Sequence, residues 1–160
     1  MQPLRIRLFG GLQVQIGDKN LSSKIGPAAG ALLAYLAAYH ERLHRREGLA
    51  TVFWPDLEPE NGRRCLNTTL WRLRKLLECY PARKGTYLAS TAQGEIGLAT
   101  SDNVWIDIKY FEERKNIGAR SSMGCAANRI SFGTHNAVIR SMVRKTSSVS
   151  YDGSTKFKCS

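Results

Sequence analysis

The sequence predicts an α+β domain over residues 1–112, followed by a basic, serine-rich tail over residues 113–160. Segments that alternate apolar and polar residues occur near both ends of the first part, which is typical of half-buried strands. Between them lie three segments with apolar residues at spacings of three and four, which indicate amphipathic helices. All 17 leucines lie between Leu4 and Leu98, so the material for a hydrophobic core is confined to the first part.

The N-terminal segment predicts a small antiparallel β-sheet. Apolar residues alternate with arginines over residues 4–8 and with glutamines over residues 12–16. The glycine pair at residues 10–11 separates the two segments, and Gly17-Asp18 follows the second one. Two alternating segments joined by a glycine-containing turn are the pattern of a hairpin or meander.

Three helices are expected next. The first covers residues 27–41 and has Pro27 in its first turn, where proline is tolerated. The second runs from about residue 45 to residue 54 and ends at Pro55, because proline cannot continue a helix. The third runs over about residues 60–79. Its apolar stripe consists of Leu66, Leu70, Leu73 and Leu77.

The remaining segments predict a hairpin and one further strand. Residues 86–89 and 95–98 flank the turn sequence Ala92-Gln93-Gly94, and residues 104–108 alternate again. Two helices of a helix-turn-helix followed by a hairpin form the winged helix-turn-helix arrangement, in which the hairpin is the wing.

The tail differs sharply in composition. Residues 113–160 contain nine serines, nine Lys or Arg residues and two acidic residues, but no leucine. Such a segment buries too little apolar surface to offset the entropy lost on ordering. We expect it to be disordered or weakly ordered, either as a solvated segment or as an arm that binds nucleic acid.

The formal net charge of +11 favours a polyanionic partner, with nucleic acid first and an anionic membrane surface second. The N-terminus lacks the apolar region of a secretory signal, and no stretch approaches the ~18 apolar residues of a membrane helix. We therefore expect a cytoplasmic protein without a membrane partner, whose four cysteines do not form a disulfide framework.

The third predicted helix carries the functional signal. Residues 63–75 contain five positive charges and no negative one. Arg and Lys neutralise phosphates, whereas Asn, Thr and Arg can hydrogen-bond base edges in the major groove. The alternative is the solvated cationic face of an ordinary helix, but the position of the segment before a hairpin favours DNA binding. The candidate DNA-binding residues are Arg63, Arg64, Asn67, Thr68, Trp71, Arg72, Arg74 and Lys75.

Residues 66–77, which read LNTTLWRLRKLL, resemble the recognition helix of OmpR/PhoB-type winged helices. The nearer resemblance is to the SARP-type regulators, which join such a domain to a bacterial transcriptional activator domain, or BTAD. Four further stretches agree in order and extend the resemblance over residues 4–112. These stretches are residues 4–12, 32–37, 49–56 and 104–112.

The resemblance implies a transcription regulator that binds double-stranded DNA, often as a homodimer on direct repeats. It implies base contacts from Asn67, Thr68 and Arg72, and phosphate contacts from Arg64, Arg74 and Lys75. Trp71 falls at a position that either faces DNA or packs beside the wing. A contact with RNA polymerase is implied for the turn from Pro55 to Glu60.

The chain also departs from the family pattern. His44 stands where Ser or Thr often caps the second helix, and Gly48 lies inside that helix. The wing, residues 85–98, has no Lys or Arg and contains Glu95. The tail does not resemble the leucine-rich helical repeats of the family. The chain is then either a truncated regulator fragment, whose reading frame or gene boundary changes near residue 113, or a short regulator with an unrelated tail.

The sequence contains little that indicates a metal site or a catalytic site. His40 and His44 lack the further ligands of a zinc site, and we expect them to be solvated or to cap a helix. We expect no metal, no cofactor and no enzymatic activity. The main alternative function is a winged-helix module that binds protein and not DNA, and an RNA-binding protein ranks behind it. The sequence leaves open the operator, the sign of regulation, the inducing signal and the oligomeric state.

Overall fold

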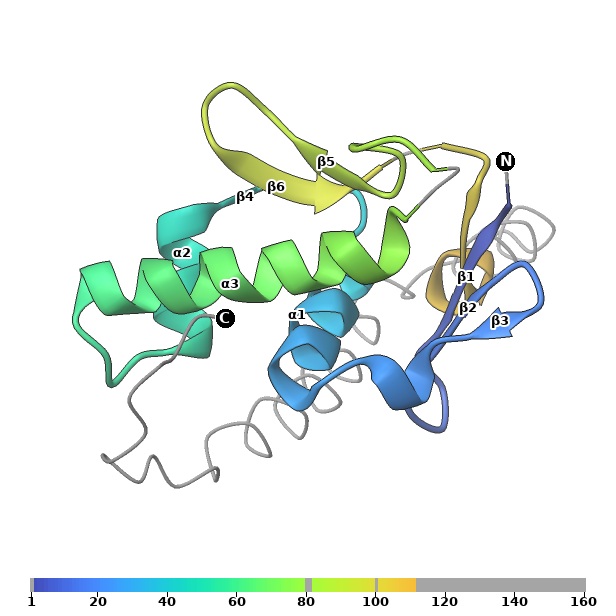
Figure 1. The fold of residues 1–160 in the computed structure, drawn as a ribbon, viewed down its shortest axis with the longest axis horizontal. Coiled ribbons are helices and arrows are strands. Elements are labelled where there is room, and N and C mark those ends of the chain that lie inside the picture. The colour runs from blue at the N-terminus through green and yellow to red at the C-terminus, as the bar shows by residue number, and fades with distance from the viewer. Residues whose placement is uncertain (1, 80–81, 100, 112–160) are drawn as a thin grey trace, which may run out of the picture.

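The computed structural model describes residues 2–79, 82–99 and 101–111, so the predicted tail, residues 113–160, lies outside the described residues. Two small sheets flank a group of helices (Figure 1). The elements in chain order are β1 (Leu4–Arg7), β2 (Gln13–Ile16), β3 (Lys19–Asn20), the 3-10 helix η1 (Ser22–Lys24), α1 (Pro27–Ala38), β4 (His44–Arg45), α2 (Arg46–Phe53), α3 (Pro59–Leu77), β5 (Leu88–Ser90), β6 (Glu95–Leu98) and β7 (Val104–Ile106).

The first sheet has the strand order β3-β2-β1-β7. The first three strands are antiparallel, as the sequence predicts, but β7 pairs with β1 in the parallel direction, which corrects the expectation of a purely antiparallel sheet. A parallel pair needs a long crossover connection, and here the helices and the second sheet provide it. Asp107, just after β7, reinforces the pairing because its Oδ2 accepts hydrogen bonds from the backbone nitrogens of Leu8, at 2.8 Å, and Phe9, at 3.1 Å.

The second sheet has the strand order β4-β6-β5. The hairpin of β5 and β6 is the one that the sequence predicts, and Gly94 at its turn has a φ of +80° that favours glycine. Strand β4 was not predicted. It pairs His44 with Ile96 and Arg45 with Glu95. Consequently His44 is a strand residue and does not cap α2, whose N-cap is Arg45.

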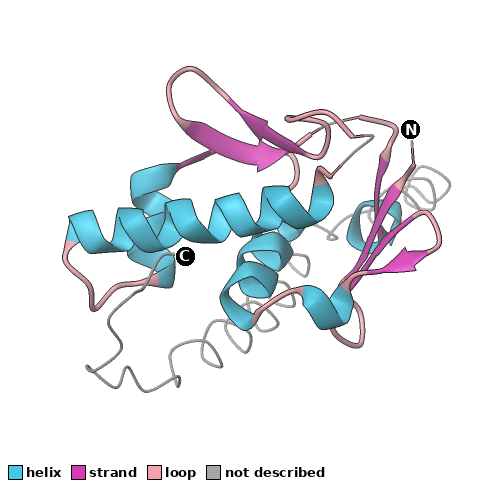
Figure 2. Cartoon of the chain, viewed as in Figure 1, coloured by secondary structure: helices cyan, strands magenta, loops and turns pink. Residues whose placement is uncertain are grey.

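The three predicted helices are present, with ends that lie within three residues of the expected ones. Helix α1 ends at Ala38 and not at residue 41, because the chain turns there with a hydrogen bond from the Arg42 nitrogen to the Tyr39 oxygen. Helix α3 is the long element in the middle of Figure 2 and packs against both α1 and α2. The predicted stripe is buried, since each of its four leucines is at most 2% exposed.

The hydrophobic core consists of the buried faces of α1, α2 and α3 together with buried residues of both sheets. Tyr87 is its largest fully buried side chain, and its hydroxyl group donates a 2.6 Å hydrogen bond to the backbone oxygen of Gln2. This bond satisfies the polar end of the ring and links the residue before β5 to the segment before β1. No helix among the described residues is long and apolar enough to cross a membrane.

Candidate nucleic-acid interface

The exposed face of α3 carries most of the candidate residues. Helix α3 begins with Pro59 and has Glu60 in its first turn and Arg74 and Lys75 in its last, which suits the helix dipole at both ends. The leucine stripe faces the core, so the opposite face is open to solvent. The exposed candidate residues are Arg63, Arg64, Asn67, Thr68, Trp71, Arg72 and Lys75, whereas Arg74 is half-buried.

Arg64 already has an ionic partner on the same helix. Its Nη2 atom lies 2.8 Å from Oε1 of Glu60, and both side chains are largely exposed. An exposed pair one helical turn apart contributes only about 0.3–0.5 kcal/mol. A phosphate could therefore replace Glu60 as the partner of Arg64 at little cost.

Trp71 is one of the exposed residues of α3. Its side chain is 59% exposed, and the Lys75 ammonium lies 5.0 Å from the ring centroid. Such a cation–π contact at an exposed site contributes about 0.5–1 kcal/mol. It holds the lysine charge close to the surface of α3.

Arg74 differs from the other seven candidates. Its Nη2 donates a hydrogen bond to the hydroxyl of Ser90 in β5, and its Nε is buried. The guanidinium therefore links α3 to the hairpin. A contact with a phosphate would require Arg74 to share or leave this partner.

Sequence reasoning missed Arg46, the first residue of α2. Its Nη1 donates to Oδ1 of Asn67 at 2.9 Å, and its Nε donates to the backbone oxygen of Gly94 at 3.1 Å. Arg46 thus connects α2, α3 and the turn of the hairpin. Only its position in the first turn of the predicted second helix distinguished it in the sequence, because contacts between separate elements leave no local pattern.

Arg46, Asn67 and Arg74 also line a groove of about 420 Å³ between α3 and the hairpin side of the molecule. Cationic residues outnumber acidic ones on its walls, and Lys84 is a second cationic residue there that the sequence did not single out. The lining residues are Arg46, Asn67, Leu70, Trp71, Arg74, Lys75, Glu78 and Lys84.

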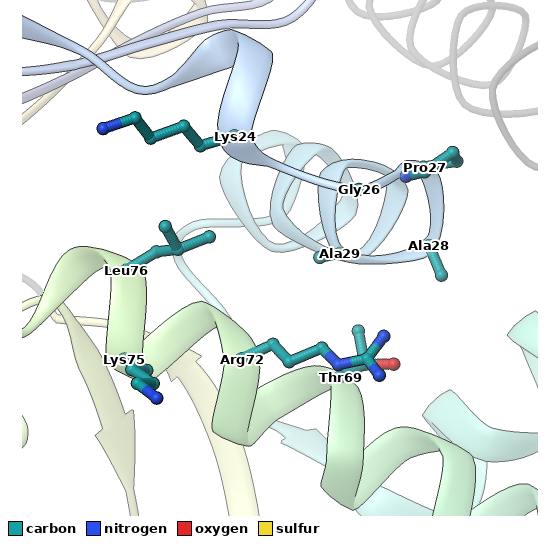
Figure 3. Close-up of a pocket in the computed structure, with 9 residues that line it drawn as sticks. All are labelled: Lys24, Gly26, Pro27, Ala28, Ala29, Thr69, Arg72, Lys75 and Leu76. Atoms are coloured by element: carbon teal, nitrogen blue, oxygen red, sulfur yellow. The ribbon is translucent and has the colours of Figure 1, made fainter. Parts of the chain in front are cut away.

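A second hollow, of about 560 Å³, lies on the other side of α3, against the start of α1 (Figure 3). Lys24, Arg72 and Lys75 line it, and none of its lining residues is acidic. Figure 3 shows the Arg72 side chain extended along α3 toward Thr69, with Lys24 across the hollow. The start of a helix attracts anions, so cations and the N-terminus of α1 favour negative charge in the same place.

The hairpin itself contributes no positive charge between residues 85 and 98. Its turn is closed by hydrogen bonds between Thr91 and Glu95, with Gln93 exposed at the tip. Neighbouring residues bring positive charge to the hairpin. They include Arg45, which pairs with Glu95 in the sheet, and the groove residues Arg46, Arg74 and Lys84.

No group of three or more His, Cys, Asp or Glu side chains among the described residues could hold a metal ion. His44 is half-buried between aromatic rings, with the centroid of Tyr35 at 5.2 Å and that of Tyr39 at 6.0 Å. Removal from water lowers the pKa of His44, and the positive charge of Arg42 lowers it further, whereas a hydrogen bond with the Tyr39 backbone opposes both effects. The expectation that His44 caps a helix was wrong, and its side chain is only partly solvated.

No protein-family model matches the chain, and no curated protein matches it significantly. Among solved structures, the chain is similar to Mycobacterium tuberculosis EmbR in complex with a low affinity phosphopeptide, with a TM-score of 0.63 and 27% sequence identity. The match covers 76% of this chain but only 31% of the EmbR chain. EmbR is a SARP-family regulator. The likeness supports a relationship between this chain and SARP-type transcription regulators.

Proposed function

We propose that the chain is a sequence-specific DNA-binding transcription regulator. Helices α2 and α3 form its helix-turn-helix, α3 enters the major groove as the recognition helix, and the β5–β6 hairpin is the wing. The observation that carries this proposal is the exposed face of α3, which is polar and cationic and has no acidic residue from Arg63 to Leu77. A major groove is wide enough for a helix, and such a face can contact both phosphates and base edges.

The proposal assigns two kinds of contact. Asn67, Thr68 and Arg72 read base edges, and Arg63, Arg64 and Lys75 contact phosphates. Arg74 links this surface to the wing through Ser90, and Trp71 holds the ammonium group of Lys75 over its ring. Lys24 joins this set, because it shares the anion-favouring hollow with Arg72 and Lys75.

The proposed function also implies two partners, which are RNA polymerase and a second copy of the chain. The turn between α2 and α3 is exposed at Pro55, Asp56 and Glu58, so it is accessible to RNA polymerase when α3 occupies DNA. Binding to direct repeats would place two copies side by side. The phosphopeptide of the EmbR complex is not carried over, because the match covers 31% of that chain.

A protein-interaction module is the second candidate, and the absence of Lys and Arg from the hairpin favours it. A cationic grip on the minor groove from residues 85–98 is not available to this chain. Salt separates the two functions. Binding through several phosphate contacts weakens steeply as salt rises, whereas docking through apolar surface does not.

The test is selection from random duplex DNA with the full 160-residue chain at two salt concentrations. We expect an enriched motif that Arg72→Ala loses, because Arg72 contacts bases. Arg5→Ala removes the same charge from an exposed position on β1 and should keep the motif. Salt-sensitive binding without a motif would reduce the chain to a non-specific polyanion binder, and no binding at low salt would favour the protein-interaction module.

A further inference from the structure

We propose that Arg46 is a positioning residue that sets the base preference of Asn67. This inference rests on the proposed function, since it concerns how α3 reads DNA. Asn67 is exposed on α3, and Arg46 reaches it from the start of α2. The interaction fixes which end of the Asn67 amide is available to a base.

The orientation of the amide follows from the chemistry of its partner. A guanidinium has only donors, so the Arg46 Nη1 atom at 2.9 Å requires the carbonyl oxygen of Asn67 and excludes its NH₂ group. The assignment of oxygen and nitrogen is therefore set by Arg46. The guanidinium thus occupies the oxygen, and the hydrogen bonds among the described residues leave the NH₂ group free to donate.

Arg46 is held in place by its second hydrogen bond. Its Nε donates to the Gly94 oxygen at 3.1 Å, and the side chain is half-buried beside the turn of the hairpin. Two bonds made by different nitrogens of one planar group restrict its rotation. A lysine ammonium lacks this planar fork, so it cannot reproduce both bonds in the same geometry.

A fixed donor predicts a specific base preference. Guanine, adenine and thymine each present an acceptor in the major groove, whereas the edge of cytosine presents the N4 amino donor. A free NH₂ group of Asn67 can therefore donate a hydrogen bond to guanine, adenine or thymine, but it finds no acceptor on the edge of cytosine. If the amide could turn over, its oxygen would accept a hydrogen bond from cytosine and the rejection would be lost.

The experiment repeats the selection from random duplex DNA with the full chain and three variants. Asn67→Ala identifies the operator position that Asn67 reads, because its base preference disappears. Arg46→Lys keeps the charge, but without the planar fork it cannot hold Gly94 and Asn67 together, so the amide is no longer held in one orientation. The double variant tests whether Arg46 acts through Asn67. Arg5→Lys makes the same substitution on β1 and is the matched control, and thermal melting of every variant checks that it is folded.

We expect the wild-type motif to exclude cytosine at the Asn67 position and Arg46→Lys to admit it. Discrimination against cytosine should fall about tenfold, the lower part of the range for one good base contact. The double variant should match Asn67→Ala at that position. Arg5→Lys should leave the motif unchanged.

Three results overturn the proposal while leaving DNA binding intact. These are a wild-type motif that contains cytosine at the Asn67 position, an unchanged preference there in Arg46→Lys, and an Arg46→Lys effect confined to positions that Asn67→Ala does not alter. A wild-type chain that selects no motif overturns the proposed function, and the positioning role with it.

Discussion

The Oε1 atom of Glu78 lies 3.2 Å from the backbone nitrogen of Tyr87 and accepts a hydrogen bond from it. The same oxygen accepts from the backbone nitrogens of Gly85, at 3.0 Å, and Leu88, at 3.1 Å. Glu78 is also the C-cap of α3. One carboxylate therefore connects the end of the proposed recognition helix to the strand that begins the wing.

We expect Glu78→Ala to lower the free energy of unfolding by about 2–4 kcal/mol, because it leaves three backbone donors without their charged acceptor. Glu78→Gln keeps a carbonyl oxygen in the same place and should cost about 1 kcal/mol. Urea denaturation of both variants measures the difference. Equal losses for the two variants would show that the oxygen at this position is not what stabilises the junction.

Two glycines provide a matched test of packing between β6 and the loop before β4. A Cβ atom at Gly97 would lie 2.9 Å from Cδ2 of Leu43 and 3.0 Å from the backbone oxygen of Arg42. Gly97→Ala should therefore destabilise the protein by about 1–3 kcal/mol, the usual range for overpacking. Thermal unfolding in a calorimeter reports the change.

Gly48 is the comparison site, since it lies inside α2 and a Cβ atom there meets nothing within 4 Å. Gly48→Ala should stabilise the protein by about 0.5–1 kcal/mol, because alanine loses less backbone freedom in a helix. A stabilising Gly97→Ala would mean that the loop at Leu43 moves aside easily. A destabilising Gly48→Ala would contradict the open space around α2.

The helices of this fold were predictable because their evidence is local. The leucine stripe of α3 repeats at helical spacing, and the structure buries all four of its leucines. Strand β4 was not predictable, since His44 and Arg45 show no alternation and become a strand only by pairing with β6. The parallel pairing of β7 with β1 is similarly non-local: alternation indicates a strand but does not name its neighbour.

In the candidate site, too, local features could be predicted from the sequence and contacts between distant elements could not. The exposed face of α3 follows from helical geometry once the leucines are buried, so seven of the eight candidates lie on the surface as expected. The contacts of Arg74 with Ser90 and of Arg46 with Gly94 join elements that are distant in sequence. Sequence periodicity contains no information on such pairs, and these two arginines, together with Glu78, connect the hairpin to the helices.

Stability should decrease on acidification through His44. Its folded-state pKa is lowered from 6.5, mainly by burial, so below that value the unfolded chain binds more protons at this residue than the folded chain does. The contribution of His44 to stability is fully present above pH 6.5 and is lost as the pH falls through the lowered pKa of the folded state. Burial beside Tyr35 and Tyr39 is the cause to be tested.

Urea denaturation of the wild type and of His44→Gln between pH 8 and pH 5, about the range in which histidine titrates, measures this contribution. The wild type should lose stability more steeply below pH 6.5 than the variant, because glutamine does not titrate. Parallel curves over the whole range would show that His44 is protonated equally well in the folded and unfolded chains. The carboxylates are common to both proteins and cancel in the comparison.

The salt dependence of DNA binding should identify the hollow at the start of α1 as a phosphate site. Lys24 lines this hollow with Arg72 and Lys75, whereas Lys19 is exposed on β3 and does not line it. Loss of one phosphate contact reduces the slope of log K against log salt by about 0.9. We therefore expect Lys24→Ala and Lys75→Ala each to flatten the slope by about that amount without changing the selected motif. Lys19→Ala removes the same charge from the molecule, so an equal change in all three variants would show that net charge alone, and not a phosphate held beside α1, controls the affinity.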